Sequence, residues 1–275
     1  MYHAPTDLDA ALDLMAGASG TVIAGGTDVY PAAGAGPVPQ TMLDVTGIAG
    51  LSDIDTGPNG VRIGAAVRWS TLARADLPPA FDALKTAARA VGSVQIQNAG
   101  TLGGNLCTAS PAADGVPPLL ILDAAVEVSS AAGGTRQLPL SAFLTGPRQT
   151  ALQPGELLTA ILIPPPSAGL VSAFEKLGSR RYLVISITMV AAAVALDDAG
   201  RVRDARVAVG AASPVACRLP ALEAALVGRN AQDFAIDPAH LAPLAPIDDV
   251  RGSAAYRRDA VAEQCRRALR RAASA

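Results

Sequence analysis

Two glycine-rich segments in the first half of the chain contain residue types that could bind a phosphate group. The first, Val22–Tyr30 (VIAGGTDVY), is an apolar run that ends in paired glycines and continues with Thr27 and Asp28. Glycines let backbone N–H groups approach a phosphate closely. A Thr or Asp at this point can equally cap a short helix. Taken alone, this segment fits a nucleotide-binding turn and an ordinary strand–helix turn about equally well.

The second segment, residues 92–114 (GSVQIQNAGTLGGNLCTASPAAD), places polar side chains beside another glycine pair. Thr101 and Asn105 flank that pair and add hydroxyl and amide donors. Asp114 ends the segment, where its carboxylate could accept a hydrogen bond from a sugar hydroxyl or cap the next helix. The abundance of Gly, Asn, Ser and Thr in residues 100–114 predicts a long functional loop.

Neither segment matches a standard nucleotide-binding motif. The motif G-x-x-x-x-G-K-[ST] is excluded, because Lys85 and Lys176 are the only lysines and neither follows a glycine. Gly34 and Gly36 are followed by Pro37, which excludes the dinucleotide fingerprint G-x-G-x-x-G. Any nucleotide bound here must therefore be held by a different architecture.

The composition is that of an ordinary globular protein. Of the 275 residues, 50% are hydrophobic and 17% are charged, which argues against disorder. A formal net charge of −2 and an aromatic content of 3% predict no nucleic-acid surface. Apolar runs such as residues 185–196 fall short of the roughly 20 residues that a membrane span needs. The N-terminus lacks the pattern of a secretory signal, so we expect a soluble protein.

The chain has three cysteines, Cys107, Cys217 and Cys265, and none belongs to a C-x-x-C pair. This spacing supports neither a structural zinc site nor an iron–sulfur cluster held by the chain itself. Isolated cysteines suit a reducing compartment better than a disulfide scaffold, which predicts a cytoplasmic location. We interpret Cys107 as a small packing residue and Trp69 as part of the core.

Regular elements must position the two glycine segments. Apolar residues at helical spacing predict helices over residues 8–15 and 81–91. Short apolar runs between turn residues predict strands, which cover residues 21–24, 42–45, 61–65, 126–129 and 157–163. The first glycine segment therefore follows a strand, and the second follows a helix.

Three consecutive prolines at residues 164–166 mark the best domain boundary, because they stiffen the chain and cannot continue a strand ladder. The apolar run 184–196 beyond them could be a strand or a helix. The other predicted elements are strands at 171–177 and 203–209 and helices at 220–227 and 255–273. We expect the arginine pairs of the last helix to face solvent. The whole pattern predicts an α+β protein with two N-terminal lobes and a smaller C-terminal domain.

Longer motifs include both glycine segments and continue past the prolines. They are AGGTD at 24–28, QIQNAGTLGGNL at 95–106, ASPAAD at 109–114, GELLTAILIP at 155–164 and SAFEKLGSRR at 172–181. In this order they resemble the FAD subunits of the molybdenum hydroxylases, the xanthine dehydrogenase and carbon monoxide dehydrogenase family. The similarity spans most of the chain.

The resemblance implies an α+β fold made of two domains. A two-lobed FAD-binding domain of the PCMH type would cover residues 1–165, with lobes of about 1–50 and 51–165. A smaller α+β C-terminal domain would cover residues 166–275. FAD would lie extended between the two N-terminal lobes.

The resemblance also implies which residues contact FAD. Those at matching positions are Val22, Ile23, Ala24, Gly25, Gly26, Thr27, Asp28, Val29, Tyr30, Val91, Thr101, Leu102, Gly103, Gly104, Asn105, Asp114, Leu158 and Lys176. The segments Val22–Tyr30 and Thr101–Asn105 would hold the pyrophosphate and adjoining parts of FAD, and Asp114 would bond a hydroxyl of the sugar chain. Gln97 departs from the Arg that is more usual in the motif. Neither histidine is placed to tether a flavin, so we expect FAD to be bound non-covalently.

In this family the FAD subunit works with two partners. A large subunit carries the molybdenum cofactor and oxidises the substrate, and a small subunit carries two [2Fe–2S] clusters. The complex is expected to be a dimer of such heterotrimers. The FAD subunit takes electrons from the clusters and gives them to NAD⁺, oxygen or a quinone, so it needs no catalytic acid or base and no metal site. Two alternatives remain open, a self-contained flavin oxidase or reductase of the same fold and a scaffold subunit that has lost its flavin.

The segment from Lys176 to Leu183 is a candidate route for electron exit. In relatives the corresponding loop runs beside the flavin ring, and Arg180 and Arg181 could attract an anionic acceptor. Tyr182 could then cover the ring until the acceptor arrives. The alternative is that these arginines face a partner subunit or water and that Tyr182 packs between domains.

Overall fold

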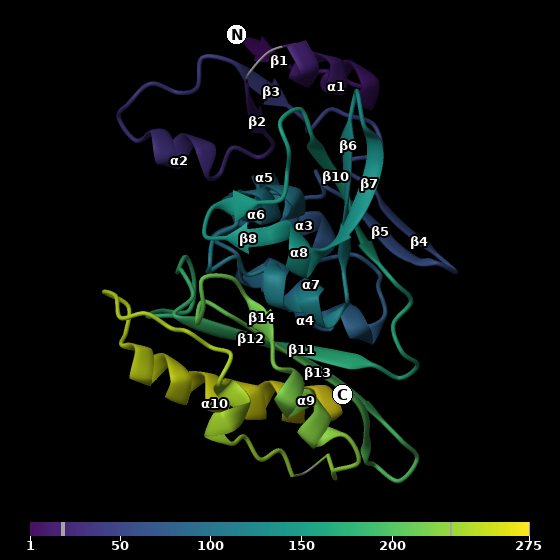
Figure 1. The fold of residues 1–275 in the computed structure, drawn as a ribbon, viewed down its shortest axis with the longest axis vertical. Helices are drawn as coiled ribbons and strands as arrows, with labels where there is room; N and C mark the ends of the chain where they lie inside the picture. The colour runs from purple at the N-terminus through teal and green to yellow at the C-terminus, as the bar shows by residue number, and fades with distance from the viewer. Residues whose placement is uncertain (18–19, 232, 275) are drawn as a thin grey trace.

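The computed structural model describes residues 1–17, 20–231 and 233–274. Its first lobe is a small parallel sheet of order β1-β3-β2 with the helix α1 packed beside it (Figure 1). The elements of this lobe are β1 (Tyr2–His3), α1 (Leu8–Gly17), β2 (Thr21–Ile23), α2 (Val29–Ala33) and β3 (Met42–Asp44). The short helix α2 buries none of its side chains and extends away from the sheet (Figure 1).

The second lobe is built on a five-stranded antiparallel sheet of order β4-β5-β10-β6-β7. Its strands are β4 (Ile54–Gly57), β5 (Gly60–Gly64), β6 (Ala125–Ser130), β7 (Gly134–Pro139) and β10 (Leu157–Ile163), with a separate hairpin of β8 (Leu144–Gly146) and β9 (Gln149–Thr150). Its helices are α3 (Trp69–Leu72), η1 (Pro79–Phe81), α4 (Asp82–Ala90), α5 (Val94–Ala99), α6 (Leu102–Thr108), α7 (Val116–Ile121) and α8 (Leu140–Phe143). These helices stack beside the sheet and carry the second glycine segment toward the first lobe (Figure 1).

The C-terminal domain is a four-stranded antiparallel sheet of order β11-β12-β13-β14. Its elements are β11 (Val171–Leu177), β12 (Thr188–Leu196), β13 (Val202–Gly210), β14 (Cys217–Arg218), α9 (Pro220–Leu226), η2 (Pro238–Leu241) and α10 (Ala254–Ala273). Helices α9 and α10 cover one face of the sheet, and α4 and α7 of the second lobe cover the other. None of the helices that the structure describes combines the length and the apolar character needed to cross a bilayer.

Burial of both faces of the sheet explains why the run 184–196 was ambiguous in the sequence. In β12, Met189 and Ala191 pack into the core shared with the second lobe, whereas Val190 and Ala192 pack against the C-terminal helices. A strand buried on both faces has no polar alternation and therefore cannot be told from a buried helix by periodicity. The strand alternative is the one that the structure adopts.

Two predictions about local structure were wrong. Residues 100–114 are not one long loop, because α6 occupies Leu102–Thr108. Thr101 caps this helix by accepting a hydrogen bond from the backbone N–H of Gly104 at 3.0 Å, and Leu102 and Leu106 are fully buried beneath it. Cap and burial together outweigh the low helix propensity of its two glycines.

The arginines of the last helix do not all face solvent. Arg257 is only 3% exposed, and its guanidinium donates to the backbone carbonyls of Ile187 and Ala211 and to Asp249. These bonds at the two terminal nitrogens offset much of the cost of burying the charge, while the buried Nε has no partner among the described residues. Tyr256, the residue before it, is 49% exposed.

Candidate functional site

The two glycine segments meet in one cleft between the first and second lobes, with a volume of about 370 Å³. Thirteen of the predicted FAD-binding residues line it: Val22, Ala24, Gly25, Gly26, Thr27, Asp28, Val29, Val91, Thr101, Gly103, Gly104, Asn105 and Leu158. The segments lie far apart in the chain, so their convergence was not guaranteed by the sequence. A volume of this size lies within the usual range for small-molecule sites.

The glycines at this cleft are needed for close approach of backbone segments. A Cβ on Gly25 would lie 1.9 Å from the carbonyl oxygen of Ala99, which belongs to the second lobe. A Cβ on Gly103 would lie 2.5 Å from the carbonyl oxygen of Ala65. Gly26 has a φ of +67°, a conformation that glycine adopts without strain. The first glycine turn can therefore rest directly on the second lobe.

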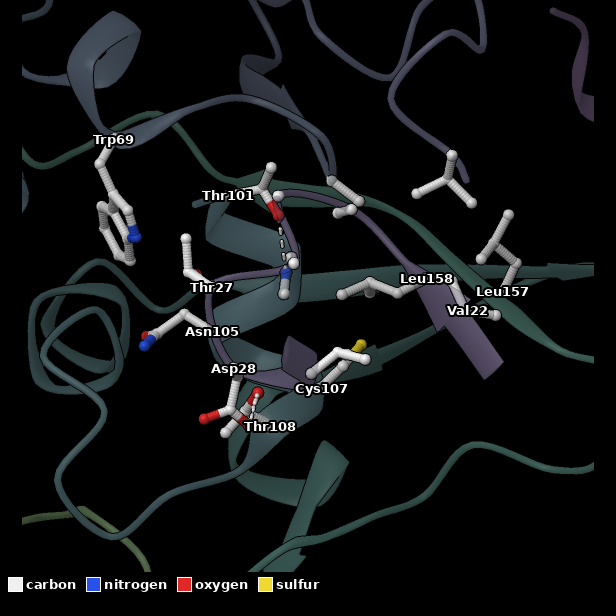
Figure 2. Close-up of a pocket in the computed structure, with 18 of the residues that line it drawn as sticks. Val22, Thr27, Asp28, Trp69, Thr101, Asn105, Cys107, Thr108, Leu157 and Leu158 are labelled. Atoms are coloured by element: carbon white, nitrogen blue, oxygen red, sulfur yellow. Dashed lines mark hydrogen bonds between the residues drawn. The ribbon is translucent and has the colours of Figure 1, made fainter. Parts of the chain in front are cut away.

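Polar groups are concentrated where the two glycine segments face each other. Figure 2 shows Thr27 and Asp28 on the turn of the first lobe beside Thr101 and Asn105 of the second lobe. Gly104 lies in the first turn of α6, where a Cβ would come within 2.9 Å of the hydroxyl of Thr101. The N–H of Gly104 donates to that hydroxyl, and the N–H of Gly103 donates to the carbonyl of Ala65. The first glycine turn, which carries no side chains at Gly25 and Gly26, is therefore the part of the cleft that suits a phosphate.

The walls of the cleft are largely apolar. Val22, Leu157 and Leu158 lie at one end, and Trp69 lies at the other (Figure 2). Trp69 is 2% exposed, as expected for a core residue, yet it also reaches the cleft. An elongated cleft with a polar middle and apolar ends fits FAD, whose pyrophosphate joins two flat ring systems. The residues present therefore fit the cofactor that the sequence motifs predict.

Glu156 lines the cleft beside Leu157 and Leu158 and was not predicted from the sequence as a site residue. Arg136 donates two hydrogen bonds to its carboxylate, at 2.6 and 2.7 Å. These bonds hold the pKa of Glu156 below its usual value. The cleft thus contains a carboxylate that stays ionised, paired with an arginine from strand β7.

Asp114 and Lys176 do not line the cleft and instead pair with each other. The ammonium of Lys176 lies 2.6 Å from the carboxylate of Asp114, and the hydroxyl of Ser186 donates to the same carboxylate at 2.6 Å. Burial raises the pKa of Asp114, and the positive charge and hydrogen bond of Lys176 offset part of that rise. Lys176 also donates to the carbonyl of Ala90 at 3.2 Å, next to the cleft residue Val91. This cluster links the C-terminal domain to the wall of the cleft.

Three other predicted residues, Ile23, Tyr30 and Leu102, also lie outside the lining of the cleft. Ile23 and Leu102 are buried, at 3% and 0% exposure, and Tyr30 is 49% exposed. Ile23 and Leu102 therefore support the glycine segments from behind. Their contact with FAD stays a prediction.

Gln97 has a structural role that the sequence left open. Its side-chain amide donates to the carbonyls of Arg89 at 3.0 Å and Val91 at 2.9 Å. These carbonyls end helix α4, so Gln97 ties the end of α4 to α5. An uncharged amide is sufficient for this task.

Cys107 lines the cleft rather than packing away from it. Its side chain is exposed at the surface of the cleft, but many protein atoms surround the thiol. Desolvation by these atoms raises the pKa of the thiol to about 12. Thr108 lies next to it and also lines the cleft. Neither residue was selected as a binding residue from the sequence, because helix α6, which brings both to the cleft, was not predicted.

Tyr182 is 64% exposed and does not line the cleft. The guanidinium of Arg181 lies 5.3 Å from the centre of its ring, and Arg180 donates to the carbonyl of Leu183 within the same loop. This exposure argues against packing of Tyr182 between domains. A gating role for Tyr182 stays a prediction.

Comparisons with known proteins define the class of this fold and site. The family model described as "FAD binding domain in molybdopterin dehydrogenase" matches residues 1–166. The one described as "CO dehydrogenase flavoprotein C-terminal domain" matches residues 172–272. The protein is thus a two-domain flavoprotein of the molybdopterin dehydrogenases, which confirms the predicted α+β fold class.

Individual relatives agree with this class. The chain is 40% identical over 187 residues to the nicotinate dehydrogenase FAD subunit of Eubacterium barkeri, covering 65% of this chain and 62% of that protein, which is less than two thirds of its length. It is 32% identical over 273 residues to the xanthine dehydrogenase FAD-binding subunit of Escherichia coli O157:H7, covering 93% and 90%. A solved CO dehydrogenase from Oligotropha carboxidovorans matches with a TM-score of 0.89 and 27% identity, covering 99% and 97%. The chain belongs to the FAD-binding medium subunits of the molybdopterin dehydrogenases, the xanthine and CO dehydrogenase type.

Proposed function

We propose that this chain binds FAD non-covalently in the cleft between its two N-terminal lobes. The observation that carries the proposal is the meeting of both glycine segments in one cleft of a chain that belongs to an FAD-binding family. The predicted residues that line the cleft would contact the cofactor directly.

We further propose that the chain has two domains, residues 1–165 and 166–275. The first would contain two lobes, of about residues 1–50 and 51–165.

Each part of the cleft would serve a different part of FAD. The turn at Gly25 and Gly26 would accept the pyrophosphate, because its glycines leave the backbone open to the cleft and Thr27 lines the cleft beside them. The N–H groups that begin α6 already donate within the protein, so Thr101–Asn105 would form the wall that faces this turn. The apolar ends would exclude water from the ring systems. Glu156 would be available to accept hydrogen bonds from a hydroxyl or amino group, since its carboxylate stays ionised.

The bound flavin would supply redox chemistry, because it can accept electrons singly and release them as a pair. We propose that electrons come from [2Fe–2S] clusters of a small partner subunit, which receive them from a large subunit with the molybdenum cofactor. The likeness to a medium chain of CO dehydrogenase supports a complex of several subunits. We propose that this complex is a dimer of heterotrimers. The electrons then leave to an external acceptor.

The three cysteines support placing the clusters on a partner rather than on this chain. Cys107, Cys217 and Cys265 are all free, and no group of His, Cys, Asp or Glu suited to a metal occurs among the described residues. Free thiols also support a cytoplasmic location.

Purification of the tagged chain from its native host tests this function. We expect flavin, iron and molybdenum to elute together from the complex. The isolated chain, loaded with FAD, should keep its flavin oxidised when organic substrates are added. Bleaching of the flavin by an organic substrate in the isolated chain would instead support a self-contained oxidase or reductase. A chain that binds no FAD would support a scaffold subunit.

A further inference from the structure

An ion pair joins the two lobes directly beside the first glycine pair. Asp28 follows that pair in the first lobe, and Arg148 lies in the turn between β8 and β9 of the second lobe. Nη1 of Arg148 donates to Oδ2 of Asp28 at 2.7 Å. The hydroxyl of Thr108 donates to the same oxygen at 3.2 Å (Figure 2). One carboxylate of the first lobe is therefore held by two donors of the second lobe.

The backbone around Arg148 is arranged to hold this position. Arg148 has a φ of +60°, which a residue with a side chain rarely adopts. Its N–H donates to the carbonyl of Ala109 at 2.8 Å, and Ala109 ends helix α6. The turn that carries Arg148 is thus fixed to the helix that carries Thr108 and the second glycine pair.

The segment that carries Asp28 is less firmly packed than the turn that carries Arg148. Asp28 is the residue before α2, and α2 buries none of its side chains. Asp28 makes no capping hydrogen bond to that helix through its side chain. The bonds to Arg148 and Thr108 are therefore the side-chain contacts that fix this carboxylate, and Asp28 and Thr108 both line the cleft.

We propose that Arg148 is a positioning residue for the cofactor, which acts with Thr108 to clasp Asp28. This clasp holds the first glycine turn across the cleft and slows the release of FAD. The proposal rests on the proposed binding of FAD in this cleft.

A different role for Arg148 would be direct attraction of the phosphates. Arg148 does not line the cleft, and its guanidinium is engaged by Asp28. The two roles predict opposite effects of Asp28→Asn. Under the clasp, this change speeds FAD release because Arg148 loses its charged partner. Under direct attraction, it slows release because a competing carboxylate is gone.

The test measures the rate of FAD release from the loaded chain into an excess of a flavin-scavenging protein. The variants are Arg148→Met, Asp28→Asn and the double variant.

The side chains of Arg148 and Asp28 are 63% and 51% exposed, so their ion pair should contribute modestly to the rate of FAD release. We expect about a two- to five-fold faster release in each single variant. The double variant should release FAD no faster than either single variant, because both changes remove the same contact. Added salt should speed release from the wild type and leave the variants nearly unchanged.

A matched control is available in Arg267→Met. The side chain of Arg267 is also 63% exposed and lies 2.8 Å from Glu263, but this pair lies on α10 in the C-terminal domain. Its release rate should equal that of the wild type. Hydrogen exchange in the FAD-free chain provides a second readout, and residues 28–36 should exchange faster in Arg148→Met than in the control.

The possible results distinguish the clasp from direct attraction and from a failure of the proposed function. Slower release from Asp28→Asn overturns the clasp in favour of direct attraction. Equal release rates in all variants, or effects of the single variants that add up in the double variant, also overturn it. A wild-type chain that binds no FAD overturns the proposed function, whereas a chain that binds FAD with no dependence on Arg148 overturns only the clasp.

Discussion

Replacing Lys176 with Met should destabilise the folded chain and make its stability depend on pH. Lys176 and Asp114 form an ion pair between the C-terminal domain and the second lobe, and their side chains are only 11% and 10% exposed. The change removes the charge of Lys176 but keeps a side chain of similar length. It leaves the carboxylate of Asp114 buried, with the hydroxyl of Ser186 still donating to it.

The magnitude follows from the cost of an unpaired buried charge. Removing one partner of a buried ion pair typically costs about 3–5 kcal/mol of unfolding free energy. The hydrogen bond from Ser186 at 2.6 Å remains, so we expect a value near the lower end, about 3 kcal/mol. The bond from Lys176 to the carbonyl of Ala90 is also lost, which should loosen the cleft wall at Val91.

The pH dependence has a definite sign. Burial already raises the pKa of Asp114, and Lys176 opposes that rise. Without Lys176 the pKa rises further, so the folded variant binds a proton more readily than the unfolded chain does. Stability is then retained at low pH and is lost as pH rises through the raised pKa of the folded state. The deficit relative to the wild type should be larger at about pH 8 than at about pH 5.

Urea unfolding of the wild type and the variant at both pH values measures this deficit. Lys85→Met is the matched control, because Lys85 pairs with Asp82 within α4 in a contact that is 17% and 45% exposed. We expect the control to cost at most about 1 kcal/mol, independent of pH. The double variant Lys176→Met/Asp114→Asn should regain part of the stability, since no unpaired buried charge remains. A deficit for Lys176→Met equal to that of the control, or one that grows toward low pH, would refute the reasoning.

Three further predictions concern the cleft. Gly25→Ala should lower the unfolding free energy by about 1–3 kcal/mol and weaken FAD binding, because its Cβ would strike Ala99. Gly17→Ala, where no atom of the described residues lies within 4 Å of the added Cβ, should leave both unchanged or raise stability by up to about 1 kcal/mol in the same urea assay. Thr101→Ala should cost about 1 kcal/mol through loss of the helix cap and reduce FAD affinity in a titration. The thiol of Cys107 should react slowly with a thiolate-specific reagent at neutral pH even without FAD, since its pKa is about 12, and rapid labelling would contradict that value.

Local patterns predicted most of the elements of seven residues or more, because apolar spacing and turn residues report local structure directly. Short helices such as α3, α5 and α8 were missed. The prediction failed at α6, where Gly103 and Gly104 lowered the apparent helix propensity. What decides that helix is the cap by Thr101 and the burial of Leu102, and burial depends on residues distant in sequence. The buried Arg257 escaped prediction for the same reason, since its acceptors come from three other segments.

The site residues likewise fall into those that local sequence predicts and those that depend on contacts distant in the chain. Both glycine segments could be selected from their composition and motifs, because those requirements are local. Arg148 could not, because nothing in its own neighbourhood shows that it reaches Asp28. Glu156 was also missed, although it lies in the motif at 155–164 and two residues before the predicted contact Leu158. The pairing of Asp114 with Lys176 also required the packing of the C-terminal sheet against the second lobe.

The flavin content of the purified chain tests the central claim most directly. The chain is incubated with FAD, freed of unbound cofactor and precipitated with acid. The account predicts about one FAD per chain, released entirely into the supernatant. It also predicts that Gly104→Val, whose Cβ would crowd Thr101 in the first turn of α6, retains little or none. Flavin in the pellet would contradict non-covalent binding, and wild-type flavin content in Gly104→Val would remove the glycine cleft from the site.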